Sequence, residues 1–413
     1  MVGTFVGYAL FYLCRKNISM AMPSMASELG ATNTQLGILG TLLYVTYGVG
    51  KFANGVLGDH ANPRAMMAAG LVLTAAANLA FAGSSALWVL AALWALNGWA
   101  QSMGFPPCAR LLAHWYSVSE RGLMWSIWNV SHQVGAGAIA ILGGFLVSHW
   151  GWRAAFVLPA FICLAGAAFV WERLRDTPAS LGLPPVARYR GDPEIDADGR
   201  ELSEAPESVR RVLVDRVLRN PYVWLISLLN MFVYVVRSGA FDWATKFLVE
   251  RKGSTVLGAG FISATFEVAG IFGAIIAGVV SDRVNRGRRG PMCLLYMALT
   301  GVGVLLFWLV PPGHPWADAA CLALIGFAVY GPQFLVAVFV VDLTSRKAAA
   351  TAVGLTGIFG YAGSALSGIG TGLCIDRFGW GGGFAFWGAA ALLGVLVAVP
   401  LWNVGPPREA RAG

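Results

Sequence analysis

Long apolar segments recur along almost the whole chain and are separated by short polar loops. A helix needs about 20 apolar residues to cross the hydrocarbon core of a bilayer. Twelve segments come close to this length, at residues 3–24, 34–57, 65–83, 87–113, 122–148, 152–172, 221–247, 257–281, 290–311, 316–342, 349–375 and 382–403. The pattern therefore predicts an all-α membrane protein with twelve transmembrane helices.

One long polar stretch, at about 173–220, separates the sixth apolar segment from the seventh. It is rich in Arg, Asp, Glu and Pro and has no apolar periodicity, as is typical of a linker. We therefore predict three parts, which are an N-terminal six-helix bundle (1–174), a cytoplasmic linker (175–220) and a C-terminal six-helix bundle (221–413).

Composition agrees with the membrane prediction, because 57% of the residues are hydrophobic and only 12% are charged. The net charge of +8 comes mostly from loops, which indicates topology rather than a nucleic-acid-binding surface. Basic residues mark alternate loops, at Arg64, Arg121, the linker arginines, Arg283, Arg286, Arg288, Arg289, Arg346, Lys347, Arg408 and Arg411. The positive-inside rule then predicts that the linker and both termini are cytoplasmic.

Two motifs occur once in each half of the chain. Gly55–Arg64, which contains Asp59, matches Gly278–Arg289, which contains Asp282 and Arg283. Gly144–Trp152 likewise matches Gly372–Trp380 at a similar separation. These repeats indicate a parallel duplication of six helices, for which a substrate site between the halves near mid-membrane is expected.

The strongest candidates for chemistry are Arg15 and Arg237, which lie at matching places in the two halves. A guanidinium inside an apolar segment costs roughly 2.5–3.5 kcal/mol on insertion scales. Each follows a tyrosine by three residues, Tyr12 and Tyr234, and Tyr8 shares the helical face of Arg15. Two such arginines favour a pair of ligands for a phosphate or carboxylate over structural ion pairs.

Other charged residues in the apolar segments have competing interpretations. Lys16 lies about 100° around the helix from Arg15 and need not face the same ligand. Asp242 is a candidate partner for Lys16 across the halves, but it is also four residues before Lys246. Lys51, with Tyr44 and Tyr47 on its face, is a candidate anion ligand or a lysine that snorkels to the interface.

His132 follows Asn129 by one helical turn, and Glu267 is a further acid within an apolar segment. A histidine is often a satisfied core residue, but its usual pKa of about 6.5 also suits contact with a phosphate monoester. Glu267 needs a cationic partner and is expected to balance the empty cavity. Four cations and two acids leave a formal charge of +2, which one phosphate dianion would neutralise.

Enzyme chemistry is not indicated. The stretch that ends at Lys51 has Val45 in place of the first glycine of a phosphate-binding loop and Phe52 in place of Ser/Thr. The six cysteines show no CxxC pairing, and no His/Cys/Asp set has the spacing of metal ligands. We predict neither metal nor cofactor, and no nucleic-acid partner.

Motifs spread nearly from end to end carry a family resemblance, among them Arg15–Pro23, Met103–Arg110, Trp128–His132, Tyr234–Trp243 and Tyr330–Gln333. In them the chain resembles the organophosphate:inorganic phosphate antiporter family of the major facilitator superfamily, of the bacterial glycerol-3-phosphate and hexose-phosphate transporter type. The resemblance implies that Arg15 and Arg237 clamp phosphate, with His132 in contact and Lys51 nearby. We add Tyr361 to the candidate substrate-binding residues.

The same resemblance implies a protein of the bacterial inner membrane in which phosphate leaves as an organophosphate enters, and we expect a monomer. The chain departs from the family at Ser238, where the glycerol-3-phosphate transporter has a tyrosine, and it has no charged residue from Ala348 to Ile375, where the hexose-phosphate transporter has an acid–lysine pair. The organic group is therefore left open. Two alternatives remain, a membrane-bound sugar-phosphate sensor and a proton-coupled organic anion transporter that uses His132 and Glu267.

Overall fold

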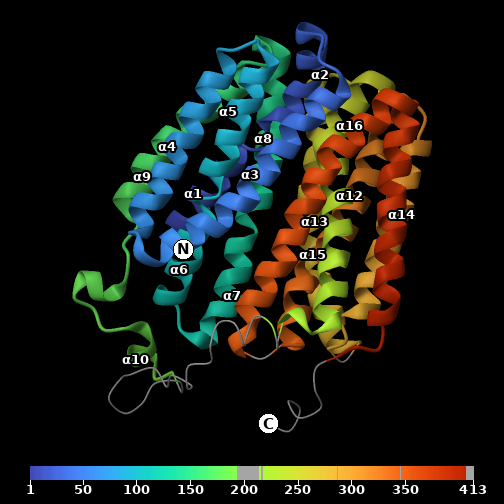
Figure 1. Cartoon of the computed structure of the whole chain (residues 1–413). Helices are drawn as coiled ribbons and strands as arrows, with labels where there is room; N and C mark the ends of the chain where they lie inside the picture. Colours follow the sequence, from blue (N-terminus) through green and yellow to red (C-terminus); the bar gives the residue numbers. More distant parts are fainter. Residues whose placement is uncertain (193–213, 215–216, 286, 345, 406–413) are drawn as a thin grey trace.

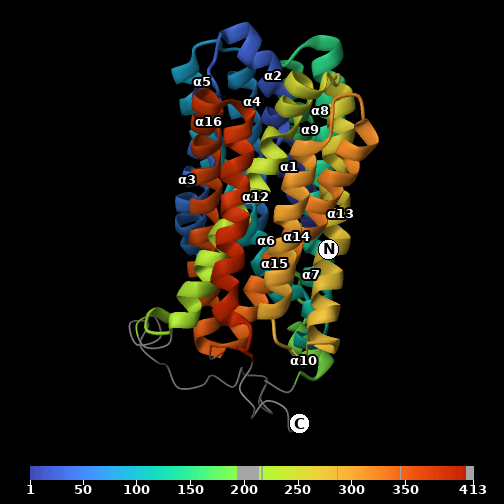
Figure 2. The ribbon, with the colours of Figure 1, turned by 90° about the vertical axis from the view of Figure 1, so that its right-hand side faces the viewer.

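The computed structural model describes residues 1–192, 214, 217–285, 287–344 and 346–405, and within these ranges the chain is helical and has no strand. The helices run roughly along one long axis and form two bundles side by side (Figure 1). The short helix α10 (Val186–Arg190), which belongs to the predicted linker, lies at one end of the molecule (Figure 2). We call this the linker end and the opposite one the far end.

Nine helices form the N-terminal half. They are α1 (Val2–Leu13), α2 (Asn17–Leu29), α3 (Asn33–His60), α4 (Pro63–Ala82), α5 (Leu87–Gln101), α6 (Phe105–Trp115), α7 (Val118–Asn129), α8 (Ser131–Trp150) and α9 (Ala154–Arg173). Three predicted segments are broken into pairs, because α1 with α2, α5 with α6, and α7 with α8 each follow one path across the bundle. Six membrane crossings result.

The C-terminal half follows a short 3₁₀ turn (Pro178–Leu181) and α10 (Val186–Arg190). Its helices are α12 (Pro221–Lys252), α13 (Val256–Arg283), α14 (Gly290–Leu309), α15 (Pro315–Asp342) and α16 (Arg346–Ala398), with a final 3₁₀ turn (Val399–Leu401). The α16 helix contains a non-helical Gly379 with φ of 66°, so it holds the eleventh and twelfth predicted crossings. Half of the predicted linker, residues 193–213 and 215–216, lies outside the described residues.

Local sequence explains where the helices start. Thr32 caps α3 in a reciprocal capping box with Gln35. Asn62 caps α4, whose first residue is Pro63, a position that needs no N–H donor. Among the described residues nine helices are long and apolar enough to span a membrane by themselves. The broken pairs α1/α2 and α5/α6 and the second arm of α16 account for the difference from twelve.

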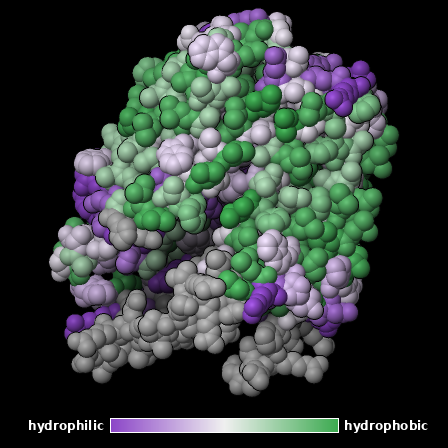
Figure 3. Space-filling view, in the orientation of Figure 1, coloured by the Kyte–Doolittle hydropathy of each residue, from purple (hydrophilic) through white to green (hydrophobic). Residues whose placement is uncertain are grey.

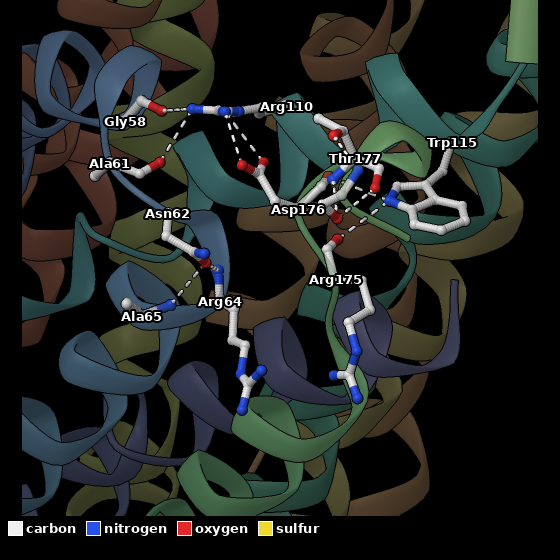
Figure 4. A network of polar contacts seen from close by, with 11 residues as sticks. Gly58, Ala61, Asn62, Arg64, Ala65, Arg110, Trp115, Arg175, Asp176 and Thr177 are labelled. Atoms are coloured by element: carbon white, nitrogen blue, oxygen red, sulfur yellow. Dashed lines mark hydrogen bonds and ion pairs between the residues drawn. The ribbon is translucent and has the colours of Figure 1, made fainter. Parts of the chain in front are cut away.

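Polar contacts fix the linker end of the N-terminal half (Figure 4). Arg110 on α6 donates to the carbonyls of Gly58 and Ala61, each at 3.0 Å, and forms an ion pair of 3.1 Å with Asp176. Trp115 donates to the carbonyl of Arg175 at 3.1 Å. These bonds join the α3–α4 turn, α6 and the start of the linker.

One repeated motif, Gly55–Arg64 with Gly278–Arg289, lies at this linker end, whereas the other, Gly144–Trp152 with Gly372–Trp380, lies at the far end. In the N-terminal copy the Arg64 guanidinium stacks on Trp171, 4.3 Å from the ring centroid, while the side chain of Asp59 lies outside the described part. In the C-terminal copy Asp282 pairs with Arg289, and Arg283 is exposed. This motif therefore holds loops between helices and does not reach the middle of the bundle.

At the far end the halves are in close contact. A Cβ atom at Gly37 of α3 would meet the carbonyl oxygen of Gly368 on α16, and one at Gly260 of α13 would meet the carbonyl oxygen of Ala140 on α8. The Asp376 carboxylate of α16 also accepts from the first residues of α3. The far end is thus closed by helix backbones in direct contact.

At the linker end the halves diverge. A cavity of about 550 Å³ lies at this end on the N-terminal half, between α3 and α6, with Lys51, Phe105 and His114 among its lining residues. The space-filling view shows a hollow between the halves at this end, while the sides are covered by apolar side chains as expected for contact with lipid (Figure 3). The molecule is therefore closed at one end and open at the other.

Candidate functional site

A polar cavity of about 110 Å³ lies at the junction of the two halves. Both arginines predicted from the sequence line it, and so do most of the other candidates. Its lining residues are Tyr8, Tyr12, Arg15, Lys16, Tyr44, Lys51, Phe105, Trp128, Asn129, His132, Tyr234, Arg237, Gln333, Tyr361 and Ser364. Residues from both halves therefore face one enclosed space.

Arg15 lies in the break between α1 and α2 rather than on a regular helix. The backbone N–H groups of Arg15 and Lys16 both donate to the carbonyl of Tyr12, at 3.3 and 3.1 Å. The C-terminal end of α1 carries a partial negative charge, which stabilises the two cations placed there. This break also explains why Lys16 lines the same cavity as Arg15, which the regular helix assumed from the sequence did not predict.

The Arg15 guanidinium is held on three sides. Its Cζ atom lies 4.4 Å from the ring centroid of Tyr12 and 4.2 Å from that of Tyr47, so two phenol faces enclose it. Its Nε donates to Oε1 of Gln101 at 3.1 Å. Among the described residues no carboxylate pairs with Arg15, so its charge is uncompensated.

Arg237 lies in the middle of the unbroken helix α12. Its Nη2 donates to the hydroxyl of Tyr330 at 3.0 Å, and this hydroxyl donates to Oε2 of Glu267 at 2.6 Å. The ring centroid of Tyr234 lies 5.5 Å from the guanidinium carbon of Arg237. The predicted cationic partner of Glu267 is therefore Arg237, reached through a phenol rather than directly.

Lys16 forms a contact between the two halves. Its Nζ lies 2.5 Å from Oδ1 of Asp242 on α12 and donates to the Tyr44 hydroxyl at 2.8 Å. Tyr44 in turn donates to Oδ2 of Asp242 at 2.6 Å. Lys246, the alternative partner considered for Asp242, pairs with Glu250 instead.

Lys51 and His132 lie on the N-terminal side of the cavity. The Lys51 Nζ is 4.1 Å from the ring centroid of Phe105 and 5.5 Å from that of Tyr361. Nδ1 of His132 bonds to the carbonyl of Asn129, while its buried Nε2 has no hydrogen-bond partner among the described residues. In the described part of the chain, neither Arg15 nor Lys51 forms an ion pair with an acid. The predicted excess of two positive charges in the cavity is therefore assigned to these two residues.

The tyrosines predicted around the site lie at or beside the cavity. Tyr8 packs on Trp128 with ring centroids 4.7 Å apart, and Tyr361 packs on Tyr47 at the same separation. Tyr47 is fully buried behind Arg15 and does not line the cavity.

Several residues of the site were not predicted from the sequence. They are Gln101 and Tyr330, which hold the arginines, and Phe105, Trp128, Gln333 and Ser364, which line the cavity. A glutamine inside an apolar segment was the available signal for Gln101. Phe105, Trp128, Tyr330 and Gln333 lie in stretches that carry the family resemblance, but that resemblance assigned them no role in the site.

The chain matches a known superfamily in both sequence and fold. A sequence model of the Major Facilitator Superfamily matches residues 4–368. The chain belongs to this superfamily. It is a transporter of that fold and not an enzyme. A bacterial homolog of the human lysosomal transporter Spinster, solved in an inward-facing and unoccupied conformation, has a TM-score of 0.77 at 16% identity and covers 97% of this chain and 95% of that one. At that identity the likeness shows the fold alone.

Three relatives match this Major Facilitator Superfamily protein along nearly all of its length. A probable hexose phosphate transport protein of Chlamydia pneumoniae is 41% identical, over 97% of this chain and 90% of its own. A glycerol-3-phosphate transporter of Bacillus subtilis is 39% identical, over 99% and 93%. The membrane sensor protein UhpC of Escherichia coli is 38% identical, over 98% and 92%. The resemblance to organophosphate transporters is thereby confirmed.

Proposed function

We propose that this protein takes up an organophosphate in exchange for inorganic phosphate. The observation that carries the proposal is that Arg15 and Arg237, from matching places in the two halves, line one buried cavity. A guanidinium binds two oxygens of a phosphoryl group in a planar fork, and a pair of them would hold it from both halves at once. His132 and Lys51 are proposed as further ligands, with Asn129 and the cavity tyrosines around them.

Charge supports exchange rather than simple uptake. The cavity residues Arg15, Lys16, Lys51 and Arg237 face two acids, Asp242 and Glu267, so the empty site has an excess of +2. Like charges repel more strongly when a site closes and loses water. A phosphate monoester carries about −1.5 to −2 at neutral pH. The loaded carrier would therefore reorient readily and the empty one would not.

Alternating access would proceed by rocking of the two six-helix bundles, for which we keep the predicted limits of 1–174 and 221–413. We propose that the linker end is cytoplasmic, since the basic loops gather there, and that the membrane is the bacterial inner membrane. The described conformation is then inward-facing, with the closed far end outside. We expect the carrier to act as a monomer, because one chain supplies both arginines.

The names of the relatives support hexose phosphates and glycerol-3-phosphate as substrates to test first. A second candidate function is sensing of a sugar phosphate without transport, which the similarity to a membrane sensor protein favours. A third, proton-coupled uptake of an organic anion, would depend on His132 and Glu267.

One experiment separates these functions. The purified protein is reconstituted into vesicles loaded with labelled phosphate, and release is followed after adding glucose-6-phosphate, glycerol-3-phosphate or a carboxylate outside. Strict one-for-one release is expected. Binding without release would instead indicate a sensor, and uptake driven by a pH gradient without internal phosphate would indicate proton coupling.

A further inference from the structure

The two arginines of the cavity are held by different atoms, and this difference shows which donors are free. Arg15 is bonded at Nε, and its buried Nη2 has no partner among the described residues. Arg237 is bonded at Nη2, and its buried Nε has no partner in the same part of the chain. The two guanidinium groups therefore leave different nitrogens free for a ligand.

The orientation of Arg15 is fixed by two kinds of contact. The faces of Tyr12 and Tyr47 enclose the guanidinium and set its plane. Rings cannot set rotation within that plane, because both edges of a guanidinium fit equally well between them. The hydrogen bond from Nε to Oε1 of Gln101 does so, and it leaves the terminal nitrogens for a ligand.

The break between α1 and α2 places Gln101 in this position. In a continuous helix the Arg15 N–H would bond the carbonyl of Phe11, four residues earlier, but here it bonds Tyr12. The carbonyl freed on Phe11 accepts from Nε2 of Gln101 at 2.9 Å. The fully buried carboxamide of Gln101 thus bonds both the free carbonyl of Phe11 and the guanidinium of Arg15.

A second carboxamide, one turn before Gln101 on α5, also bonds the backbone at the break. Nδ2 of Asn97, four residues before Gln101 on α5, donates to the carbonyl of Cys14 at 2.9 Å. Asn78 of α4 approaches the same carbonyl at 3.4 Å and accepts from Asn17 at 2.8 Å. Without these amides the open turn would leave buried carbonyls unbonded, which is unfavourable in a membrane.

We propose that Gln101 is a positioning residue that aims the terminal nitrogens of Arg15 at the phosphoryl group, an inference that rests on the proposed function. Arg237 is held instead at Nη2 by the hydroxyl of Tyr330, which in turn bonds Glu267. The N-terminal arginine is thus oriented by a neutral amide and keeps its full charge for the ligand.

The test measures inorganic phosphate binding by the full chain in detergent, from the rise in the unfolding midpoint with phosphate up to about 0.1 M against chloride at equal ionic strength. Gln101→Met keeps the side-chain length and removes both hydrogen bonds. We expect it to raise the Kd for phosphate about 10- to 100-fold. In an Arg15→Lys background the same change should alter the Kd by less than about threefold, because the two residues act as one unit.

Asn54→Leu is the matched control. Nδ2 of Asn54 donates to Ser102 at 2.7 Å, next to Gln101 in the same bundle, and the side chain is buried, but it does not touch Arg15. It should lower the unfolding midpoint without phosphate and leave the Kd within about threefold. Equal effects of Gln101→Met on the Kd in both backgrounds, or a Kd within threefold of the parent, would overturn the inference.

Gln101→Asn serves if Gln101→Met does not fold, since the shorter amide cannot reach both Arg15 and Phe11 and should also raise the Kd at least tenfold. A parent chain that binds no phosphate would refute the proposed function itself, and the inference with it. If the parent binds phosphate but Gln101→Met changes the Kd equally in the parent and Arg15→Lys backgrounds, only the role of Gln101 is refuted.

Discussion

Removal of the Asp376 carboxylate should shift the protein toward a conformation that is open at the far end. Asp376 accepts four hydrogen bonds from the start of α3, which are 3.1 and 2.8 Å from Asn33 and 2.7 and 2.6 Å from Thr34. It thereby caps α3 from the opposite half of the molecule. All four bonds must break when the halves separate at this end.

The magnitude follows from the exposure of the contact. Hydrogen bonds to a charged group are worth about 1.5–3 kcal/mol each when buried, but water replaces them readily at an exposed site. A capping side chain is worth about 0.5–2 kcal/mol in total. We take about 1.4 kcal/mol for Asp376→Ala, which corresponds to a tenfold change in the equilibrium between the two conformations.

Pulsed EPR distances between spin labels at Ala86→Cys and His314→Cys would report this shift. Both residues are exposed at the far end, one in each half, and the background would carry Cys374→Ser because the other five cysteines are buried. The long-distance population should rise about tenfold in Asp376→Ala.

Glu28→Ala is the control for this experiment. Glu28 bonds Arg153 and Trp152 at the same end but within the N-terminal half. Its loss should leave the distance distribution unchanged. An unchanged distribution in Asp376→Ala, or an equal shift in both variants, would refute the assignment of Asp376 to the closed far end.

Three further predictions concern the cavity. Arg15→Lys and Arg237→Lys should each abolish phosphate exchange in vesicles, because a point charge cannot replace the fork, and activity within a few-fold of the parent would contradict bidentate binding. Asp242→Asn should lower the free energy of unfolding by up to about 3 kcal/mol, because it leaves Lys16 buried and unpaired, and Lys16→Met added to it should restore much of the loss in thermal unfolding. Affinity for a phosphate monoester should fall about tenfold per pH unit below its second pKa of about 6, because the dianion becomes a monoanion there. Affinity for a sulfonate analogue should not show this pH dependence, and competition binding would measure both.

The apolar pattern was sufficient to predict the number of crossings, because the thickness of the bilayer fixes the length of any helix that spans it. It could not predict the break at Cys14–Lys16, since no Gly or Pro marks it. The break depends instead on amides of α4 and α5 that meet the free carbonyls only in the folded bundle. The orientation of Arg15 and the presence of Lys16 in the same cavity follow from that break. Helical periodicity therefore could not predict them.

The arginine pair itself was predictable because charged residues are costly and therefore rare in membrane-spanning segments. The partners that orient each arginine were not, because they lie on the fourth crossing of each half, α5 and α15, but differ in residue type. Gln101 holds one and Tyr330 the other. The charged groups thus match between the halves, while the side chains that hold them differ.

This difference has a consequence for how ligand and conformation are coupled. The Lys16–Asp242 pair joins the two halves beside the cavity, and Lys16 also lines the cavity. A phosphate dianion bound by Arg15 offers Lys16 an alternative anionic partner, so ligand binding competes with a bond that holds the halves together. The uncompensated charge lies on the N-terminal half, at Arg15 and Lys51, whereas the charge of Arg237 is tied to Glu267 through Tyr330. Under the proposed exchange mechanism, the N-terminal half would bind the anion most strongly. Loosening of Lys16 from Asp242 by the bound anion would then let the far end open only in the loaded carrier.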